Sequence, residues 1–395
     1  MFWSFTFADN NVESLITPIA RDLIIDNSIA ISRNLTIQFS SEIDDELLGM
    51  LCDTQWGVPG QLVFRQMKIR EFVSHAAYIT WISLKRGNRT LLVLAANYHN
   101  LAIDNRNVNS YQLRYLTAFT PAARRSKGRS KSGISRNKKR SILRDVVNDA
   151  LAKQNLFPYS NRQHQGEIYY AFIEDNNTYS RNLTETIGMG TMRTISSMAF
   201  CRLKPGKANE FSRANTSDYP MLSELLKEQY ESYSFFRLND IFRFGEYFVL
   251  RTESNIAAGV QVYKNHLIID NISGLKGYVI KNVLARIPGV ARYFNLKGFQ
   301  YVMFGGIVAR PGKEHLLPTL FESALAECNM NVGMFWGDPE CDVYQCIKKS
   351  GNRGIMSLFL PSASVTCAAR FEGFEQQSIV EYGKKRLFVN LIDLA

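Results

Sequence analysis

The chain has 395 residues, of which 46% are hydrophobic and 12% aromatic, which is enough apolar material to bury a large core. This length predicts two or more domains. The longest apolar runs, such as Leu91–Ala96, are far shorter than the roughly 20 residues needed to cross a bilayer, so the sequence predicts no membrane span. Acidic residues such as Asp9 and Glu13 interrupt the apolar N-terminal stretch, which argues against a secretory signal, and we expect a cytoplasmic protein.

The net charge of +11 is distributed unevenly along the chain. Nine Lys or Arg residues and no acid lie within residues 124–141. A charge this local indicates an anionic ligand near one loop rather than a nucleic-acid surface along the whole chain. The six cysteines and five histidines are scattered and form no cluster at the spacing of a zinc site, so we expect reduced thiols and no metal.

Hydrophobic periodicity predicts a mixed order of helices and strands in the first half of the chain. In chain order we expect a helix over 11–27, a strand over 35–39, a helix over 44–53, three antiparallel strands over 77–84, 90–97 and 112–119, a helix over 142–151, a strand over 167–173, a helix over 177–187 and a strand over 192–203. The polar turn at 204–207 is the best internal boundary.

A similar order of elements returns after this boundary. We expect a helix over 219–233, strands over 247–252, 257–263, 267–271 and 301–309, a helix over 316–328, a strand over 332–336 and a helix over 340–349. The stretches IEDNNTYSRNLTETIG and WGDPECDVYQCIKKSG close the two halves in a similar way, which suggests an internal duplication.

The basic run follows a predicted strand and precedes a predicted helix, which is the arrangement that binds a pyrophosphate on main-chain N–H groups and a helix N-terminus. Here the sequence resembles the GNAT acyltransferase superfamily. The acyl-CoA motif of that family is Arg or Gln, two residues, Gly, one residue, and Gly or Ala, and residues 125–130 read RSKGRS, with Ser in the last position. The strand YLTAFTPAAR before it resembles the central strand of the family.

A second match lies at the distance that the family requires. The next strand is followed by Asn177, then by the small residue Ser180 three positions on, and then by Gly188 and Met189. The segment VPGQLVF over 58–64 also resembles a segment between the early helices of some members. The resemblance covers about residues 35–205.

The resemblance implies an α+β fold with two GNAT-like domains, each a mixed, mostly antiparallel sheet flanked by helices and containing a splayed pair of parallel strands. It implies an N-terminal extension over 1–30, an acyl-CoA-binding domain over 31–205, and a degenerate domain over 206–395 that shapes the substrate cleft. The cofactor is expected to be acetyl-CoA or another acyl-CoA, and its partner an amine of unknown identity. The residues that would hold the cofactor are Leu116, Ala118, Phe119, Thr120, Arg124, Arg125, Ser126, Lys127, Gly128, Arg129, Ser130, Asn177 and Ser180.

The catalytic groups do not follow from the motif. The frequent proton donor of the family is a Tyr seven residues after the Asn, where this chain has Thr184. Tyr179 lies about 140° around the helix from Thr184, at about 100° per residue, and these two residues are the candidates. Three alternatives remain open: proximity and water do the work, the acid and base come from the second half, or the enzyme is inactive.

The second half lacks the motif, since residues 308–315 read VARPGKEH. Pro311 removes one N–H and Glu314 would repel a phosphate, which predicts a copy that does not bind the cofactor. Two other functions remain open: a nucleic-acid-associated protein that uses residues 124–144 as a basic arm, and a degenerate acyltransferase that binds acyl-CoA as a regulatory ligand. The basic arm has no aromatic residue on which bases could stack, which favours the acyltransferase.

Overall fold

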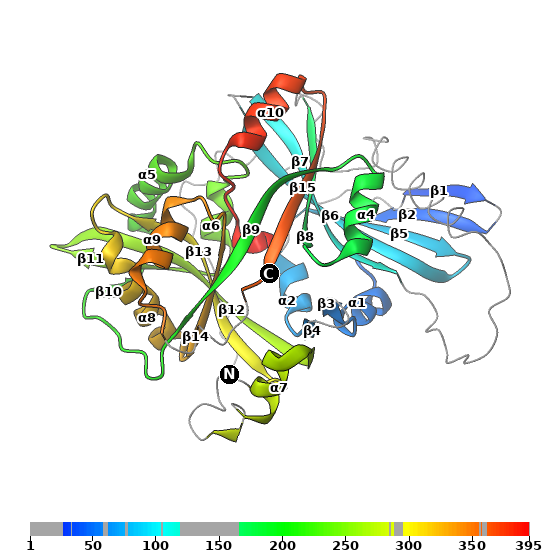
Figure 1. The fold of residues 1–395 in the computed structure, drawn as a ribbon. Helices are drawn as coiled ribbons and strands as arrows, with labels where there is room; N and C mark the ends of the chain where they lie inside the picture. The colour runs from blue at the N-terminus through cyan, green and yellow to red at the C-terminus, as the bar shows by residue number, and fades with distance from the viewer. Residues whose placement is uncertain are drawn as a thin grey trace, which may run out of the picture.

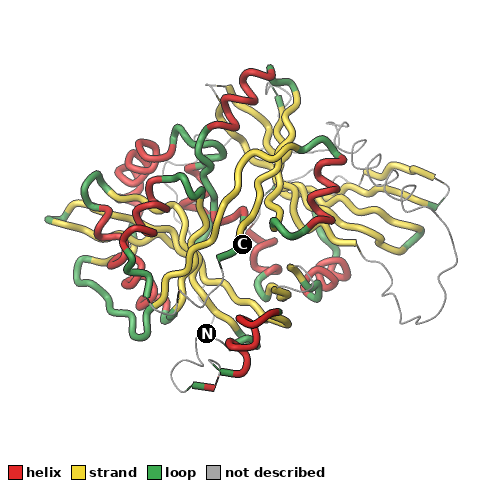
Figure 2. The backbone as a smooth tube through the Cα atoms, viewed as in Figure 1, coloured by secondary structure: helices red, strands yellow, loops and turns green. Residues whose placement is uncertain are grey.

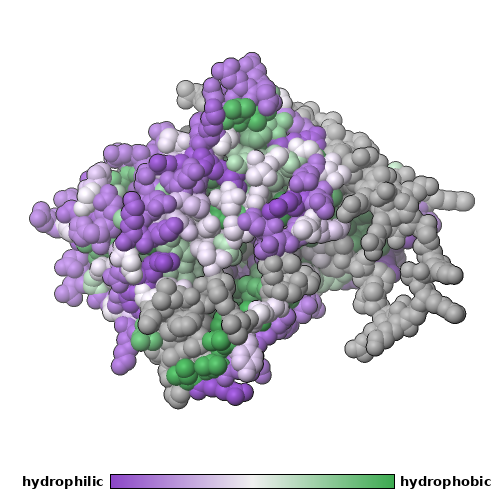
Figure 3. Space-filling model, in the orientation of Figure 1, coloured by the Kyte–Doolittle hydropathy of each residue, from purple (hydrophilic) through white to green (hydrophobic). Residues whose placement is uncertain are grey.

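A computed structural model describes residues 27–32, 34–57, 62–75, 78–103, 106–118, 166–283, 286–287, 295–354, 357 and 362–394. Within these residues, fifteen strands belong to one sheet that runs through two lobes (Figures 1 and 2). Hydrophilic residues cover most of the described surface on the face shown in Figure 3. No helix in the described ranges has both the length and the apolar character to span a bilayer.

The elements of the first half begin with the edge of the sheet. In chain order they are β1 (Asn27–Ser32), β2 (Leu35–Ser40), α1 (Asp45–Cys52), β3 (Trp56–Gly57), β4 (Leu62–Gln66), α2 (Ile69–His75), β5 (Ile79–Arg86), β6 (Arg89–Ile103), β7 (Arg106–Ala118), β8 (Glu167–Glu174), α4 (Thr178–Thr186) and β9 (Gly190–Cys201).

The second half repeats the order of strands and helices. Its elements are β10 (Phe211–Arg213), α5 (Tyr219–Tyr230), α6 (Leu238–Arg243), β11 (Glu246–Thr252), β12 (Asn255–Ile272), α7 (Gly274–Asn282), β13 (Phe299–Ala309), α8 (Leu317–Cys328), β14 (Val332–Gly337), α9 (Asp342–Ser350), β15 (Ser364–Glu372) and α10 (Gln376–Lys384). Short 3-10 turns lie at Thr216–Asp218, Glu314–Leu316 and Leu391–Asp393.

The strand order is symmetric about the pair β15 and β9. It reads β1-β2-β5-β6-β7-β8-β15-β9-β14-β13-β12-β11-β10, with β4 attached to β12 and β3 to β4. On each side of the centre lies one parallel pair, β7 with β8 and β13 with β14, and the other pairs are antiparallel. The two halves therefore share one arrangement of strands around their parallel pairs.

Each half completes its sheet with a strand from the other half. Strand β15, near the end of the chain, pairs with β8 over its full length, whereas β9 of the first half pairs with β14. Both strands run through the middle of the molecule in Figure 1. Residues 31–205 alone would leave the edge of β8 without β15, and an unpaired strand edge exposes main-chain N–H and C=O groups. The domain boundary at 206 remains a prediction.

Both halves carry a β-bulge at the same place in the third antiparallel strand. On β7, Tyr115 and Leu116 together face one residue of β6, and Tyr115 has a φ of 53°. On β13, Gly306 and Ile307 together face one residue of β12, and Gly306 has a φ of 47°. Bulges re-aim the main chain at sites of function, and the shared position supports the duplication.

The two bulges have different surroundings. In the second half, the hydroxyl of Tyr247 donates to the Gly306 carbonyl at 2.7 Å, and the hydroxyl of Tyr230 donates to the Ile307 carbonyl. The side chain of Leu391 fills the space beside Gly305, where an added Cβ would lie 2.4 Å from Leu391 Cγ. The space around this bulge is occupied by the protein's own side chains.

Most elements that the sequence predicts within the described ranges are present. One prediction is wrong: residues 257–263 and 267–271 belong to a single strand, β12. The polar residues between them stay in the strand because Lys264, Asn265 and His266 continue the pairing with β13, and the buried Asn265 side chain also donates to the Tyr301 hydroxyl at 3.0 Å. The sequence did not predict β1, β3, β4, α2, β10, α6, α7, β15 or α10. The helix expected over 142–151 lies outside the described residues, as does the one over 11–27 except for Asn27, which begins β1.

Substitution of Gly305 by Ala tests the packing of the C-terminal segment against the second bulge. The new methyl group would clash with Leu391, so we expect a loss of about 1–3 kcal/mol in the free energy of unfolding. Gly49→Ala in α1 is the control, because no atom lies within 4 Å of its new methyl group, and it should gain about 0.5–1 kcal/mol. Urea denaturation of both variants measures the difference, and equal stabilities would contradict this packing.

Candidate active site

The parallel strands β7 and β8 separate partway along their length. They are paired from Asn109 with Glu167 to Gln112 with Tyr170, but β7 continues to Ala118 and β8 continues to Glu174. Beyond Gln112, β7 remains paired with β6, and β8 remains paired with β15. The sheet is therefore open between β7 and β8, while β6 and β15 remain paired with their other edges.

A cavity of about 260 Å³ occupies this opening. Its lining includes Leu113 and Leu116 from β7, Ala171 and Ile173 from β8, and Leu183 from α4. These side chains are apolar, and α4 covers this face of the sheet. The opening is the splayed pair of strands that the sequence predicts, although β7 ends at Ala118 in the described range.

Three of the predicted cofactor residues line this cavity: Leu116, Asn177 and Ser180. The Asn177 side chain also caps α4, since its oxygen accepts a hydrogen bond from the Ser180 N–H at 3.0 Å. Ala118 ends β7. Residues 119–130, which include the predicted pyrophosphate loop, lie outside the described residues.

The two candidate catalytic residues have different positions on α4. Thr184 is buried and lines the cavity, but its hydroxyl is within hydrogen-bonding distance of the Ser180 and Arg181 carbonyls, at 3.1 and 2.9 Å. Tyr179 has 57% of its surface exposed and does not belong to the described lining of the cavity. The structure therefore brings Thr184, and not Tyr179, to the opening.

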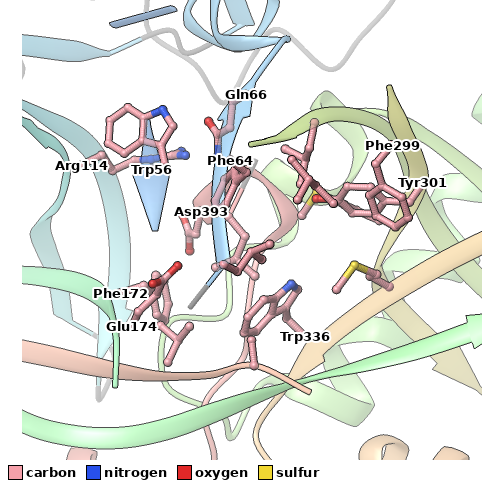
Figure 4. A pocket seen from close by; sticks show the side chains of 18 of the residues that line it. Trp56, Phe64, Gln66, Arg114, Phe172, Glu174, Phe299, Tyr301, Trp336 and Asp393 are labelled. Carbon is pink, nitrogen blue, oxygen red and sulfur yellow. The ribbon is translucent and has the colours of Figure 1, made fainter. Parts of the chain in front are cut away.

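A second cavity of about 340 Å³ adjoins the first. The two share the side chains of Trp56, Phe64, Gln66, Leu113, Arg114, Tyr115, Phe172 and Glu174. Further lining comes from the second half, where Phe299 and Tyr301 of β13 lie across the cavity from Phe172 and Glu174 (Figure 4). Most of these side chains are apolar or aromatic, so the cavity fits an apolar group.

Glu174 is the acidic residue at the junction of the two cavities. It ends β8, and Phe172, two residues earlier, lines the same two cavities. Within the described part of the chain its carboxylate has no hydrogen bond or ion pair. Burial raises the pKa of Glu174. Glu174 was not predicted from the sequence, although an acid at the end of a strand, three residues before the cap of α4, lies where a site residue can be expected.

Tyr115 is held at the bulge by a cage of aromatic rings. Its ring stacks on Trp81, with centroids 6.0 Å apart, and meets Trp56 and Phe72 edge-on at 5.7 and 6.3 Å. The guanidinium of Arg114 lies 4.9 Å from the Tyr115 ring centroid. A left-handed backbone at a non-glycine residue costs roughly 1–3 kcal/mol, so the cage is what maintains this conformation. The sequence alone had no signal for it.

A buried polar cluster joins the two halves beside the second cavity. The Arg237 guanidinium donates to Asp240, to the Tyr170 hydroxyl at 2.8 Å and to Asp393 at 2.6 Å. His99 lies 3.5 Å from Asp240 and 3.9 Å from Asp393. These residues come from β6, β8, α6 and the C-terminal turn, so the cluster fixes the C-terminal segment against the opened strands.

The cluster changes the ionisation of its members. Burial and the charge of Arg237 lower the pKa of His99 to about 4, so the imidazole is neutral at pH 7. Burial alone would raise the pKa of Asp240, but Arg237 and His99 hold it below its usual value. Arg237 therefore faces carboxylates, and His99 adds no positive charge at neutral pH.

Comparison with known proteins identifies the fold. The sequence matches no protein-family model and no curated protein. Among solved structures, one of Saccharomyces cerevisiae N-myristoyltransferase with bound myristoyl-CoA aligns with a TM-score of 0.52 at 10% identity, over 93% of this chain and 87% of that chain. A second structure of that enzyme aligns with a TM-score of 0.51 at 10% identity, over 91% and 88%. The fold is therefore the tandem GNAT fold.

The pH dependence of stability tests the buried state of His99. The pKa of His99 is about 4 in the folded chain, compared with 6.5 without burial, so the unfolded chain binds more protons between these values. Stability should therefore fall as the pH is lowered from 6.5 to 4, with His99 contributing up to about 1.4 kcal/mol per pH unit. His99→Gln should remove that part of the slope in urea denaturation, and an unchanged slope would contradict a neutral buried imidazole.

Proposed function

We propose that the chain is an acyl-CoA-dependent N-acyltransferase that passes an acyl group, acetyl in the simplest case, directly to an amine. The observation that carries this proposal is the opening between β7 and β8 with its cavity, which adjoins a second cavity built by both halves. A direct transfer requires a donor and an acceptor to meet in one enclosed site. Two joined cavities provide such a site.

The first cavity is the place for the acyl-CoA arm. The pantetheine arm carries amide groups, and these would pair with the separated edges of β7 and β8 as an additional strand does. The main-chain N–H groups of residues 126–130 would hold the pyrophosphate, with Asn177 and Ser180 beside the arm.

The thioester carbonyl would lie beside the main-chain N–H groups of the bulge on β7. The turn at Tyr115 and Leu116 changes the direction of the main-chain N–H groups within the opened strand. Such N–H groups are suited to stabilise the oxyanion that forms when the amine attacks. In the reaction the C–N bond forms, the C–S bond breaks, and the thiolate leaves with a proton from the amine.

The second half would shape the site without binding a cofactor of its own. Its bulge carbonyls are already bonded to Tyr230 and Tyr247, and Leu391 fills the space beside it. These side chains occupy the space directly beside the second bulge, where a pantetheine arm would otherwise lie. The second half instead contributes Phe299, Tyr301 and Trp336 to the cavity for the acceptor.

Replacement of Gly128 by Glu tests cofactor binding. A bulky acid in the predicted pyrophosphate loop should weaken the binding of acetyl-CoA at least about tenfold, or about 1.4 kcal/mol, in titration calorimetry. Gly49→Glu on α1 carries the same change of charge far from the loop in sequence and should bind as the natural chain does. Equal affinities in all three proteins would contradict the proposal. Salt-sensitive binding of nucleic acid with no affinity for any acyl-CoA would favour the basic-arm alternative.

Two substitutions of Asn177 separate its cap from a contact with the cofactor. Asn177→Ala removes the cap and should lower the free energy of unfolding by about 1 kcal/mol, whereas Asn177→Asp keeps an oxygen acceptor and should not. If the Asn177 amide donates to the cofactor, both variants should bind acetyl-CoA more weakly. Full affinity in Asn177→Asp would show that the residue acts only as a cap.

A further inference from the structure

The carboxylate of Glu174 lines both cavities without a partner among the described residues. Glu174 has intermediate exposure, and it belongs to the shared lining of the opening and of the second cavity. A carboxylate that is partly removed from water loses part of its solvation, and a cation or hydrogen-bond donors compensate that loss. A ligand with a positive charge would compensate the Glu174 carboxylate in this cavity.

The other charged or titratable groups around these cavities do not supply that charge. They are Arg114 and Tyr115 on β7, Tyr301 on β13, and Asp393 in the C-terminal turn. The Arg114 guanidinium donates to the Ile392 carbonyl at 2.6 Å and lies over the Phe72 ring, 4.2 Å from its centroid. Tyr115 and Tyr301 carry no charge at pH 7, and burial raises their pKa values further above that pH.

Asp393 is already compensated, unlike Glu174. Its side chain is fully buried, and its oxygens lie within hydrogen-bonding distance of Arg237, Tyr170 and Asn390. Its carboxylate is therefore already paired within the cluster that joins the two halves. Of the two carboxylates that line the second cavity in the described residues, Glu174 is the one that can receive a ligand.

The rest of the second cavity indicates what the ligand carries besides its charge. Aliphatic and aromatic side chains dominate its lining, and Trp56, Phe64, Phe299 and Trp336 stand around its centre (Figure 4). About 340 Å³ of such space stabilises an apolar body, at roughly 25 cal/mol per Å² of apolar surface removed from water. A strongly polar amine would find few partners there.

On the basis of the proposed function, we propose that the acceptor is an amine with an apolar body, and that Glu174 binds its ammonium group and acts as the general base. The ammonium would transfer one proton to the Glu174 carboxylate, which leaves a neutral nitrogen to attack the thioester carbonyl. The C–N bond forms as the C–S bond breaks, and a second proton from the nitrogen leaves with the thiolate. Glu174 then releases its proton to solvent, which restores the carboxylate.

Binding of n-octylammonium tests the recognition step without any turnover. Calorimetry at pH 7 should show that n-octylammonium binds the full chain more tightly than n-octanol, and that Glu174→Gln lowers its affinity at least about tenfold without changing the affinity for n-octanol. Glu185→Gln, on the exposed surface of α4, is the control with the same change of charge. Equal binding of n-octylammonium by the natural chain and by Glu174→Gln would overturn the proposal.

The pH dependence of transfer from acetyl-CoA to n-octylamine tests the role as a base. Glu174→Gln should lower kcat/KM about 100-fold at pH 7. This loss should shrink as the pH approaches the amine pKa near ~10, because the free amine needs no base. Glu174→Asp, which keeps the carboxylate, should recover part of the activity. An equal loss at every pH would indicate a merely structural role and would overturn the proposal.

The two proposals fail in different ways. If acetyl-CoA does not bind and no amide forms, the proposed function is wrong, but Glu174-dependent binding of n-octylammonium would still stand. If acetyl-CoA binds and amides form without any effect of Glu174→Gln, the function stands and the role of Glu174 is wrong. Near-ultraviolet circular dichroism of each variant verifies that the fold is retained.

Discussion

The separation of β7 from β8 is the constraint on which the rest of the structure depends. Two parallel strands normally stay paired, because each unpaired main-chain group loses a hydrogen bond. Here β6 holds one strand and β15 holds the other, so the pair can open beyond Gln112 and Tyr170 without loss of the sheet. The cavity for a ligand is a direct result of this arrangement.

The exchange of β9 and β15 between the halves connects that opening to the second half of the chain. β15 belongs to the second half in sequence but lies against β8, and Asp393 and Leu394, which follow it in the chain, line the second cavity. Arg237 and Asp393 then secure the C-terminal turn beside the second cavity. The two copies have diverged within one fold: one bulge faces an opening, and the other is filled by Tyr230, Tyr247 and Leu391.

The charges around the site follow a consistent division. Groups that join the halves are paired with each other, as Arg237 is with Asp240 and Asp393, and such pairs are costly to break once buried. Glu174 is left outside this network at the edge of two apolar cavities. The Glu174 carboxylate takes no part in the cluster that joins the halves, and it is therefore the carboxylate that we propose for ligand binding.

The sequence by itself determined the order of most local elements and the concentration of positive charge over 124–141, because periodicity and charge depend on neighbours along the chain. Only the tertiary structure decided the place of β15 beside β8, the left-handed turn at Tyr115 and the isolation of Glu174. Each of these three features depends on which distant segments of the chain lie side by side. In a sheet, the choice of neighbouring strand depends on side-chain packing and burial rather than on a local sequence pattern. For the same reason, the sequence predicts two separate strands over 257–263 and 267–271, where the fold has the single strand β12.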